Sequence, residues 1–317
     1  MMKIILDTNI YRNLIKDKTS EEIEIIQEKI IAAAKAQSIT ITFPIIPAME
    51  LINHYNDTHP VIKDECRKGL NLLVNLSTDK TKNNLHVKFT PPMDVILGSY
   101  LFGKEEDFLK IYAQAITLAQ KLAGNLDITP EDSINDAIKT VSEQLDFEKE
   151  MIRQNYESYL KSINEGNVDW AYFQGKGRKE IRRKFFDGLR KGELSFLVAQ
   201  SLLDRAYFNA KETYQKDEEF FRKVIQFMKD FCPALVMNEL LLDNIGSGVV
   251  AISDLMDKRW NTILDISLIF GTLYNPQNDD IILVTEDQNI IDSFDKCGFN
   301  GKAIKLDDFL ALLDIEQ

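Results

Sequence analysis

The stretch Lys3-Ile4-Ile5-Leu6-Asp7-Thr8-Asn9 determines how the rest of this chain is interpreted. Residues 3–6 form a short, mainly apolar run, which is typical of a strand buried on both faces of a parallel sheet. The three residues that follow favour a turn or a helix N-cap. We therefore predict a buried strand followed by a turn and a helix, with the Asp7 carboxylate at the carboxyl end of the strand.

Strand and helix patterns alternate in the first 78 residues and again at the end of the chain. Helices are expected at residues 20–36, 47–56, 259–274, 288–296 and 307–313, and strands at residues 39–43, 281–284 and 303–306. This alternation predicts an α/β fold, in which a parallel sheet carries helices on both of its faces.

The middle of the chain has a different pattern. Long helical periodicities occur there with almost no convincing strand, at residues 105–123, 130–163, 194–210 and 218–231. We therefore predict a discontinuous α/β domain, residues 1–78 plus 235–317, that is interrupted by a large all-α insertion, residues 79–234.

Composition excludes several classes of protein. The 317 residues include 38 Lys and Arg against 50 Asp and Glu, and a net charge of −12 excludes a protein that coats nucleic acid by charge alone. The three cysteines are odd in number and far apart, which predicts neither a disulfide framework nor a CxxC metal site. No apolar run approaches the ~18 residues of a membrane span. We expect a cytoplasmic protein that does not enter a membrane.

Four acidic residues stand where carboxylates are unusual. Asp7 and Asp287 each follow a buried strand, Asp265 interrupts an apolar helix, and Glu50 lies in the first turn of the helix after the second strand. In open parallel sheets, ligands bind at the carboxyl ends of the strands. Four carboxylates gathered there would repel one another unless a hard divalent cation bound them, and oxygen-only ligands favour Mg²⁺ or Mn²⁺ over zinc.

Each acid also has a purely structural explanation. The two strand-end aspartates could be helix N-caps, and Glu50 could complement the positive end of its helix. Asp265 could be the buried partner of an arginine, such as Arg12 or Arg259. We favour a shared site because all four acids are directed to one edge of the predicted sheet.

The ordered set of motifs resembles the PIN-domain nucleases. It consists of Asp7-Thr8-Asn9 after an N-terminal strand, a glutamate at the start of the second helix, an aspartate within an apolar helix, and Val284-Thr285-Glu286-Asp287 closing a later strand. A short final strand and a closing helix also match the usual end of that family. The resemblance covers residues 1–78 and 235–317 and none of the insertion. The size of this insertion, after the second helix, departs from the family pattern.

The resemblance implies a Rossmann-like sheet of about five parallel strands and a phosphodiesterase that depends on Mg²⁺ or Mn²⁺ and usually acts on RNA. It implies four catalytic, metal-binding carboxylates: Asp7, Glu50, Asp265 and Asp287, the last either directly or through water. Asn9 and Thr285 would orient water or phosphate. The expected products carry a 5′-phosphate and a 3′-hydroxyl.

A basic segment inside the predicted insertion, residues 176–191, is a candidate nucleic-acid-binding surface. Its eight basic residues are Lys176, Arg178, Lys179, Arg182, Arg183, Lys184, Arg190 and Lys191. Phe185 and Phe186 interleave with them, and cations beside aromatic rings suit single-stranded nucleic acid. The alternative is a solvated helix whose aromatic rings face the core.

These observations predict an endoribonuclease that hydrolyses single-stranded RNA through a metal-activated water. An antitoxin or other protein partner, and a homodimer, are compatible with it. The alternative is a catalytically weak PIN-fold scaffold that binds RNA or a protein through the helical insertion. A phosphatase with an aspartyl nucleophile is disfavoured, because Asn9 stands where that class has a second aspartate.

Overall fold

The computed structural model describes residues 1–79, 86–87, 89–104, 112–124, 131–163, 166 and 179–315. Its strands are β1 (Met2–Leu6), β2 (Ile39–Ile41), β3 (Phe43–Pro44), β4 (Thr78–Asp79), β5 (His86–Val87), β6 (Phe89–Thr90), β7 (Asp280–Val284) and β8 (Ala303–Ile304). Its helices up to residue 163 are α1 (Thr8–Ile15), α2 (Ser20–Ala36), α3 (Ile45–Asn53), α4 (Pro60–Ser77), α5 (Met93–Phe102), α7 (Ala113–Ala123) and α8 (Asp132–Ile163). The later ones are α10 (Lys179–Arg190), α11 (Glu193–Ala210), α12 (Glu218–Asp230), α13 (Cys232–Gly246), the 3-10 helix η2 (Lys258–Asn261), α14 (Thr262–Leu273), α15 (Gln288–Lys296) and α16 (Leu306–Leu312).

The predicted α/β fold is confirmed: a parallel sheet has the strand order β2-β1-β7-β8. It has four strands, where about five were expected. The strand predicted at residues 39–43 is broken at Thr42, whose N–H donates to Ile4 O, and Phe43–Pro44 forms a separate parallel pair with β6. The β1–β2 register accordingly ends at Ile41, opposite Ile4.

The sheet separates two hydrophobic cores. Ile4 and Leu6 belong to one core and Ile5 to the other, as expected when successive side chains of a strand point to opposite faces. The first core includes apolar residues of α1 to α4, α7 and the first half of α8, and the second includes residues of α5 and α11 to α15. Each core draws on both the predicted α/β domain and the predicted insertion, so the cores do not follow that boundary.

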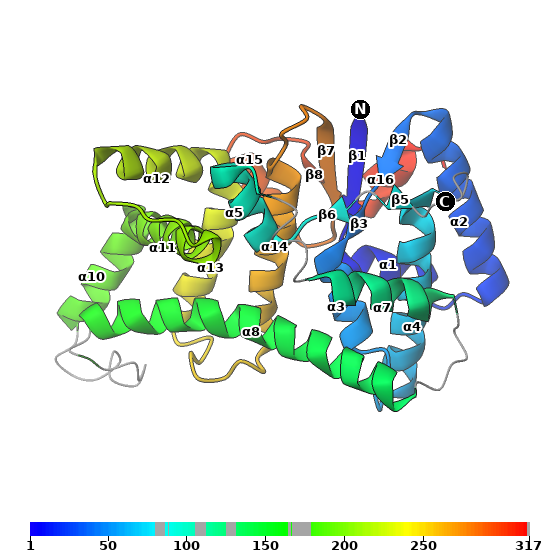
Figure 1. Ribbon diagram of the computed structural model, residues 1–317, viewed down its shortest axis with the longest axis horizontal. Helices are drawn as coiled ribbons and strands as arrows, with labels where there is room; N and C mark the ends of the chain where they lie inside the picture. The colour runs from blue at the N-terminus through cyan, green and yellow to red at the C-terminus, as the bar shows by residue number, and fades with distance from the viewer. Residues whose placement is uncertain are drawn as a thin grey trace.

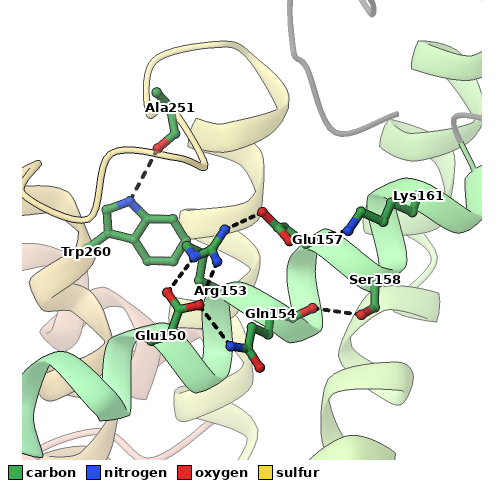
Figure 2. A network of polar contacts seen from close by, with 8 residues as sticks. All are labelled: Glu150, Arg153, Gln154, Glu157, Ser158, Lys161, Ala251 and Trp260. Atoms are coloured by element: carbon green, nitrogen blue, oxygen red, sulfur yellow. Dashed lines mark hydrogen bonds and ion pairs between the residues drawn. The ribbon is translucent and has the colours of Figure 1, made fainter. Parts of the chain in front are cut away.

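The long helix α8 connects the two sides of the molecule and lies across the end of the sheet opposite the N-terminus (Figure 1). On its surface, Arg153 donates to both carboxylate oxygens of Glu150 at 2.6 Å and also pairs with Glu157 (Figure 2). On its buried side, Tyr156 stacks on Trp260, with ring centroids 6.2 Å apart. The ion pairs stay within α8, whereas the Tyr156–Trp260 stack packs α8 against the segment that leads into α14. In the described part of the chain, no helix is both long and apolar enough to cross a membrane.

Helix α14 approaches β6 closely because residue 271 is glycine. A Cβ at Gly271 would lie 2.4 Å from Thr90 Cγ2, a distance that would force one of the two elements to move. Thr90 in turn shares a 2.6 Å hydrogen bond with the Thr42 hydroxyl. The short strand β6, from the predicted insertion, is thus enclosed between the sheet and α14.

The spacing of the three cysteines predicted no disulfide framework, but the structure contains one disulfide. Cys232, at the start of α13, is bonded to Cys297, which follows α15, and only Cys66 remains a free thiol among the three. The two bonded cysteines are 65 residues apart in sequence, with a Cα–Cα distance of 5.9 Å. Sequence spacing did not reveal the pair because α13 and α15 come together only through packing on the same face of the sheet.

Candidate functional site

Two of the predicted acids lie at the carboxyl ends of adjacent strands. Asp7 follows β1 and is 3% exposed, and Asp287 follows β7 by three residues and is half-buried. Thr285 connects them: its hydroxyl donates to Asp7 Oδ2 at 2.8 Å and accepts from the Asp287 N–H at 3.1 Å. Thr285, which was predicted to orient water or phosphate, therefore links Asp7 and Asp287 through hydrogen bonds.

The structural explanation applies differently to these two residues. Asp287 is an N-cap whose carboxylate accepts from the Asn289 N–H at 2.7 Å. Asp7 occupies the N-cap position of α1 without a well-formed capping hydrogen bond, although the backbone N–H groups of Thr8 and Asn9 are near enough to lower its pKa in part. The side chain of Asn9, which was predicted to orient water or phosphate, is exposed.

Glu50 and Asp265 belong to the helices α3 and α14, and both feel the charge of Asp7. Glu50 lies in the second turn of α3 rather than the first, because the helix begins at Ile45 instead of Pro47. Its carboxylate accepts from the Thr8 hydroxyl at 2.5 Å. Asp265 lies in the first turn of α14, since the segment before it is a 3-10 helix, and no hydrogen bond joins its side chain to another described residue.

The electrostatics of three of these acids are unusual for surface carboxylates. Burial raises the pKa of Asp7, although the Thr285 hydrogen bond opposes the change. Burial also raises the pKa of Glu50 to about 7, with the Asp7 charge adding to it. The pKa of Asp265 lies well above its usual range because of burial and the charges of Asp7, Glu50 and Asp287. Each acid therefore responds to the charge of at least one other.

No arginine neutralises Asp265 in the described part of the chain. Arg259 pairs with Asp257 at 2.6 Å, and Arg12 donates weakly to Cys66 Sγ at 3.5 Å, so the arginine explanation offered for Asp265 is wrong. The positive charge of Arg12 nevertheless lowers the pKa of Glu50 in part. A buried carboxylate without a paired cation is costly, which makes this edge a candidate cation site.

The chemistry of these side chains suits a metal ion better than their present geometry does. Four carboxylates, with hydroxyl groups from two threonines beside them, are the all-oxygen donor set that Mg²⁺ and Mn²⁺ prefer. However, among the described residues, no three His, Cys, Asp or Glu side chains are positioned so that they could hold a metal ion together. The chemistry of the donors fits a divalent cation, whereas their present side-chain positions do not form a finished cage.

Sequence reasoning missed three residues of this region. Thr8 was noted only as part of a turn, yet it donates to Glu50. Tyr11, one helical turn after Asp7, is fully buried with a hydroxyl that has no hydrogen-bond partner. Lys149 of α8 contributes a positive charge that lowers the pKa of Glu50 in part. Of these, only Thr8 carried a sequence signal, its place in the Asp-Thr-Asn triplet.

The basic segment forms α10 at one end of the molecule, far along its long axis from β1 and β7 (Figure 1). Five of its predicted residues are exposed on this helix: Lys179, Arg182, Arg183, Lys184 and Arg190. Lys191 is exposed just after it, and Lys176 and Arg178 lie outside the described residues.

The pairing of these cations and the position of the aromatic rings limit what α10 could bind. Lys184 and Arg190 pair with acids of the same helix, and no ion pair joins Arg182 or Arg183 to a described residue. The suggested stacking role of Phe185 is wrong, because its ring is fully buried in the second core. The cations of α10 therefore remain available to solvent, but without Phe185 as a stacking platform.

Comparisons of this chain with protein-family models, with curated proteins and with solved structures found no match.

Proposed function

We propose that this protein is a divalent-metal-dependent endoribonuclease of the PIN type, acting on single-stranded RNA. The observation that carries the proposal is a group of buried and half-buried acids: Asp7 and Asp287 after β1 and β7, Glu50 on α3 and Asp265 on α14. Asp7, Glu50 and Asp265 have raised pKa values, respond to one another's charges, and have no ion pair with a described residue. A site that concentrates unpaired negative charge is suited to a doubly charged cation.

The proposed ligands are the four predicted acids: Asp7, Glu50, Asp265 and Asp287. A bound Mg²⁺ or Mn²⁺ would supply an activated water and neutralise charge on the phosphate oxygens. The Thr285 hydroxyl donates to the Asp7 carboxylate and accepts from the backbone N–H of Asp287, and the Thr8 hydroxyl donates to the Glu50 carboxylate. The two threonines thus position Asp7 and Glu50 without belonging to the proposed ligand set.

The proposal requires the side chains to rotate toward a shared ion, because they do not form a cage as they stand. Carboxylates that raise one another's pKa gain from such a rotation, since a common cation replaces their repulsion with attraction. The positive ends of three helices favour the ionised form of these carboxylates, which is the form that binds a metal ion. Asp7 precedes α1, Asp265 lies in the first turn of α14, and Asp287 caps α15.

The absence of a ready metal cage among the described residues favours the second candidate, a scaffold with little or no turnover. In that case the acids would be remnants of a site, and RNA or a protein partner would bind the helices between α5 and α13. The exposed cations of α10 are the surface such a partner would contact.

Cleavage of a labelled single-stranded RNA tests both candidates. We expect cleavage in Mn²⁺ that EDTA abolishes, and that Asp7→Asn reduces at least about 100-fold while the circular dichroism spectrum stays unchanged. Asp295→Asn, a change of an exposed acid on α15, is the matched control and should keep full activity. Cleavage that survives in Asp7→Asn would reveal a contaminating nuclease, and an inactive wild type would favour the scaffold.

The cytoplasm remains the proposed location, but the Cys232–Cys297 disulfide counts against it, because stable disulfides are typical of oxidising compartments. Counting free thiols in protein isolated from its native cell under alkylating conditions tests this point. Three free thiols would support the cytoplasm, and one would contradict it. An antitoxin-like partner and a homodimer are also carried forward as proposals.

A further inference from the structure

A lysine of α8 lies where that helix crosses from one hydrophobic core to the other. The buried apolar residues of α8 up to Leu145 belong to the first core, and those from Ile152 onward belong to the second. Lys149 comes four residues after Leu145 and three before Ile152, a spacing that places all three on one face of the helix. Because the sheet separates the two cores, the turn of α8 that carries Lys149 passes over the end of the sheet.

That end is the carboxyl end of the strands, where the acids lie. The strands of the sheet all run parallel to β1, and β1 runs from the N-terminus toward α8 (Figure 1). Helix α8 packs against α3, which carries Glu50, and against α14, which carries Asp265. The positive charge of Lys149 acts on Glu50, whose pKa it lowers in part. The fold therefore brings a cation of the predicted insertion to the proposed metal site.

Lys149 has no acid of its own in the described part of the chain. The acids on either side of it already have cationic partners: Glu148 pairs with Arg205 at 3.1 Å, and Glu150 pairs with Arg153 at 2.6 Å. No ion pair joins Lys149 to a described residue, although it is half-buried. Taking a charged group partly out of water is costly unless an opposite charge compensates it. An unpaired, half-buried lysine beside a proposed phosphodiesterase site points to an anion that the substrate supplies.

The proposed site also has a use for a cation besides the metal ion. Four ionised carboxylates carry more negative charge than one divalent cation neutralises, and each RNA phosphate adds a further negative charge. A lysine ammonium group is a compact positive charge with three N–H donors, which suits the non-bridging oxygens of a phosphate. Cations fixed in this way stabilise the charge that develops when a phosphate is attacked.

We propose that Lys149 is a phosphate-binding residue of the carboxylate site, with its ammonium group donating to a non-bridging oxygen of the scissile phosphate. This inference rests on the proposed function and deepens it, because it makes α8 a part of the substrate site. The alternative is that Lys149 serves only as a counter-ion for Glu50 and does not contact the substrate. The two roles differ in their response to a phosphate ligand.

The test is nucleotide binding to the full-length protein in Mn²⁺, measured by isothermal titration calorimetry. The probe is uridine 5′-monophosphate, which carries the phosphate that the expected cleavage would leave, and uridine is the control ligand. Lys149→Gln should weaken binding of the nucleotide at least about ten-fold, the effect of losing a hydrogen bond to a charged group, and should leave binding of uridine unchanged. Lys149→Arg keeps the positive charge and should retain most of the affinity.

Binding of Mn²⁺ itself separates a role in phosphate binding from a role in packing. Lys149→Gln removes a positive charge beside the carboxylates, so its affinity for Mn²⁺ should equal or exceed that of the wild type. Loss of packing would instead weaken the binding of Mn²⁺ and nucleotide together. Lys139→Gln, a change of an exposed lysine on the same helix, is the matched control and should alter neither affinity.

Cleavage gives a second readout of the same residue. At saturating RNA and Mn²⁺, Lys149→Gln should cleave about 100-fold more slowly than the wild type, as expected when one donor to a developing negative charge is removed. Equal nucleotide affinity of Lys149→Gln and the wild type, or an equal loss of affinity for uridine, would overturn the inference. A wild type that does not bind the nucleotide would overturn it as well.

The inference and the proposed function can fail separately. If Asp7→Asn loses Mn²⁺-dependent cleavage but Lys149→Gln binds the nucleotide like the wild type, the nuclease stands and the phosphate-binding role of Lys149 is wrong. If nucleotide affinity depends on Lys149 but the wild type shows no Mn²⁺-dependent cleavage, Lys149 binds phosphate in a protein that does not cut RNA.

Discussion

The Thr285 hydroxyl donates to Asp7 Oδ2 at 2.8 Å, a contact between residues 278 positions apart in the sequence. It joins the ends of β1 and β7, which pair in parallel with Leu6 opposite Val284. The residue after each of these partners is therefore the first that can leave the sheet and turn its side chain to the edge. The candidate site follows from this register, because it places one acid and its hydrogen-bond donor side by side.

Binding of Mn²⁺ should stabilise the folded protein. At a Mn²⁺ concentration 100 times the dissociation constant, the free energy of unfolding should rise by about 2.7 kcal/mol, measured by urea unfolding. Asp265→Asn should abolish this increase. The same variant should be at least as stable as the wild type without metal, because it removes a carboxyl group whose charged form is disfavoured by burial and by Asp7, Glu50 and Asp287. Failure of Mn²⁺ to stabilise the wild type would contradict the metal site.

Stability without metal should depend on pH through Glu50. Its pKa of about 7 in the folded protein lies above the ordinary value, so between these two values the folded state binds more protons than the unfolded state. The free energy of unfolding must then fall as the pH rises through this range, by up to about 3 kcal/mol from this group. Glu50→Gln should flatten the fall in a series of urea unfolding curves, and an equally steep fall in the variant would exclude Glu50 as its source.

The cations of α10 should contribute to RNA binding but not to the chemical step. Replacing Arg182, Arg183 and Lys184 together by glutamine should weaken binding and reduce the slope of log affinity against log salt by about 2, at ~0.7 per phosphate contact. Cleavage at saturating RNA should stay unchanged because α10 lies far from the sheet (Figure 1). Replacing the exposed Lys29 and Lys35 of α2 is the control. An unchanged salt slope would leave α10 as a solvated helix.

Reduction of the disulfide should destabilise the protein. The Cys232–Cys297 bond closes a loop with a sequence separation of 65, for which loss of the cross-link is expected to cost about 4 kcal/mol by chain entropy. Urea unfolding of Cys297→Ser, compared with the wild type with and without dithiothreitol, measures this cost. Reductant should not affect the variant, and a wild type that is insensitive to reductant would show that the bond is not formed in solution.

Much of the fold could be predicted because hydrophobic periodicity is a local property of the chain. The helix expected at residues 20–36 is α2, and the one expected at 288–296 is α15, with the same bounds. Strand ends were less certain: the strand expected at residues 39–43 breaks at Thr42, whose hydroxyl donates to Ile4 O, and Phe43–Pro44 pairs with β6 instead of β1. Helix starts were also less certain: α3 begins at Ile45, two residues before the expected start at Pro47, so Glu50 lies in its second turn and not in its first.

By itself, the sequence determined the strands of the main sheet and several of its helices, that the sheet is parallel, and which four acids to examine; α4, α5 and the short strands β4 to β6 were not predicted. Only the tertiary structure decided which side chains meet: Thr8 with Glu50, Arg205 with Asp94 and Glu148, and Cys232 with Cys297. The reason is physical. Periodicity depends on neighbours a few residues away, whereas these contacts depend on how separate elements pack against a common sheet, which no local pattern specifies.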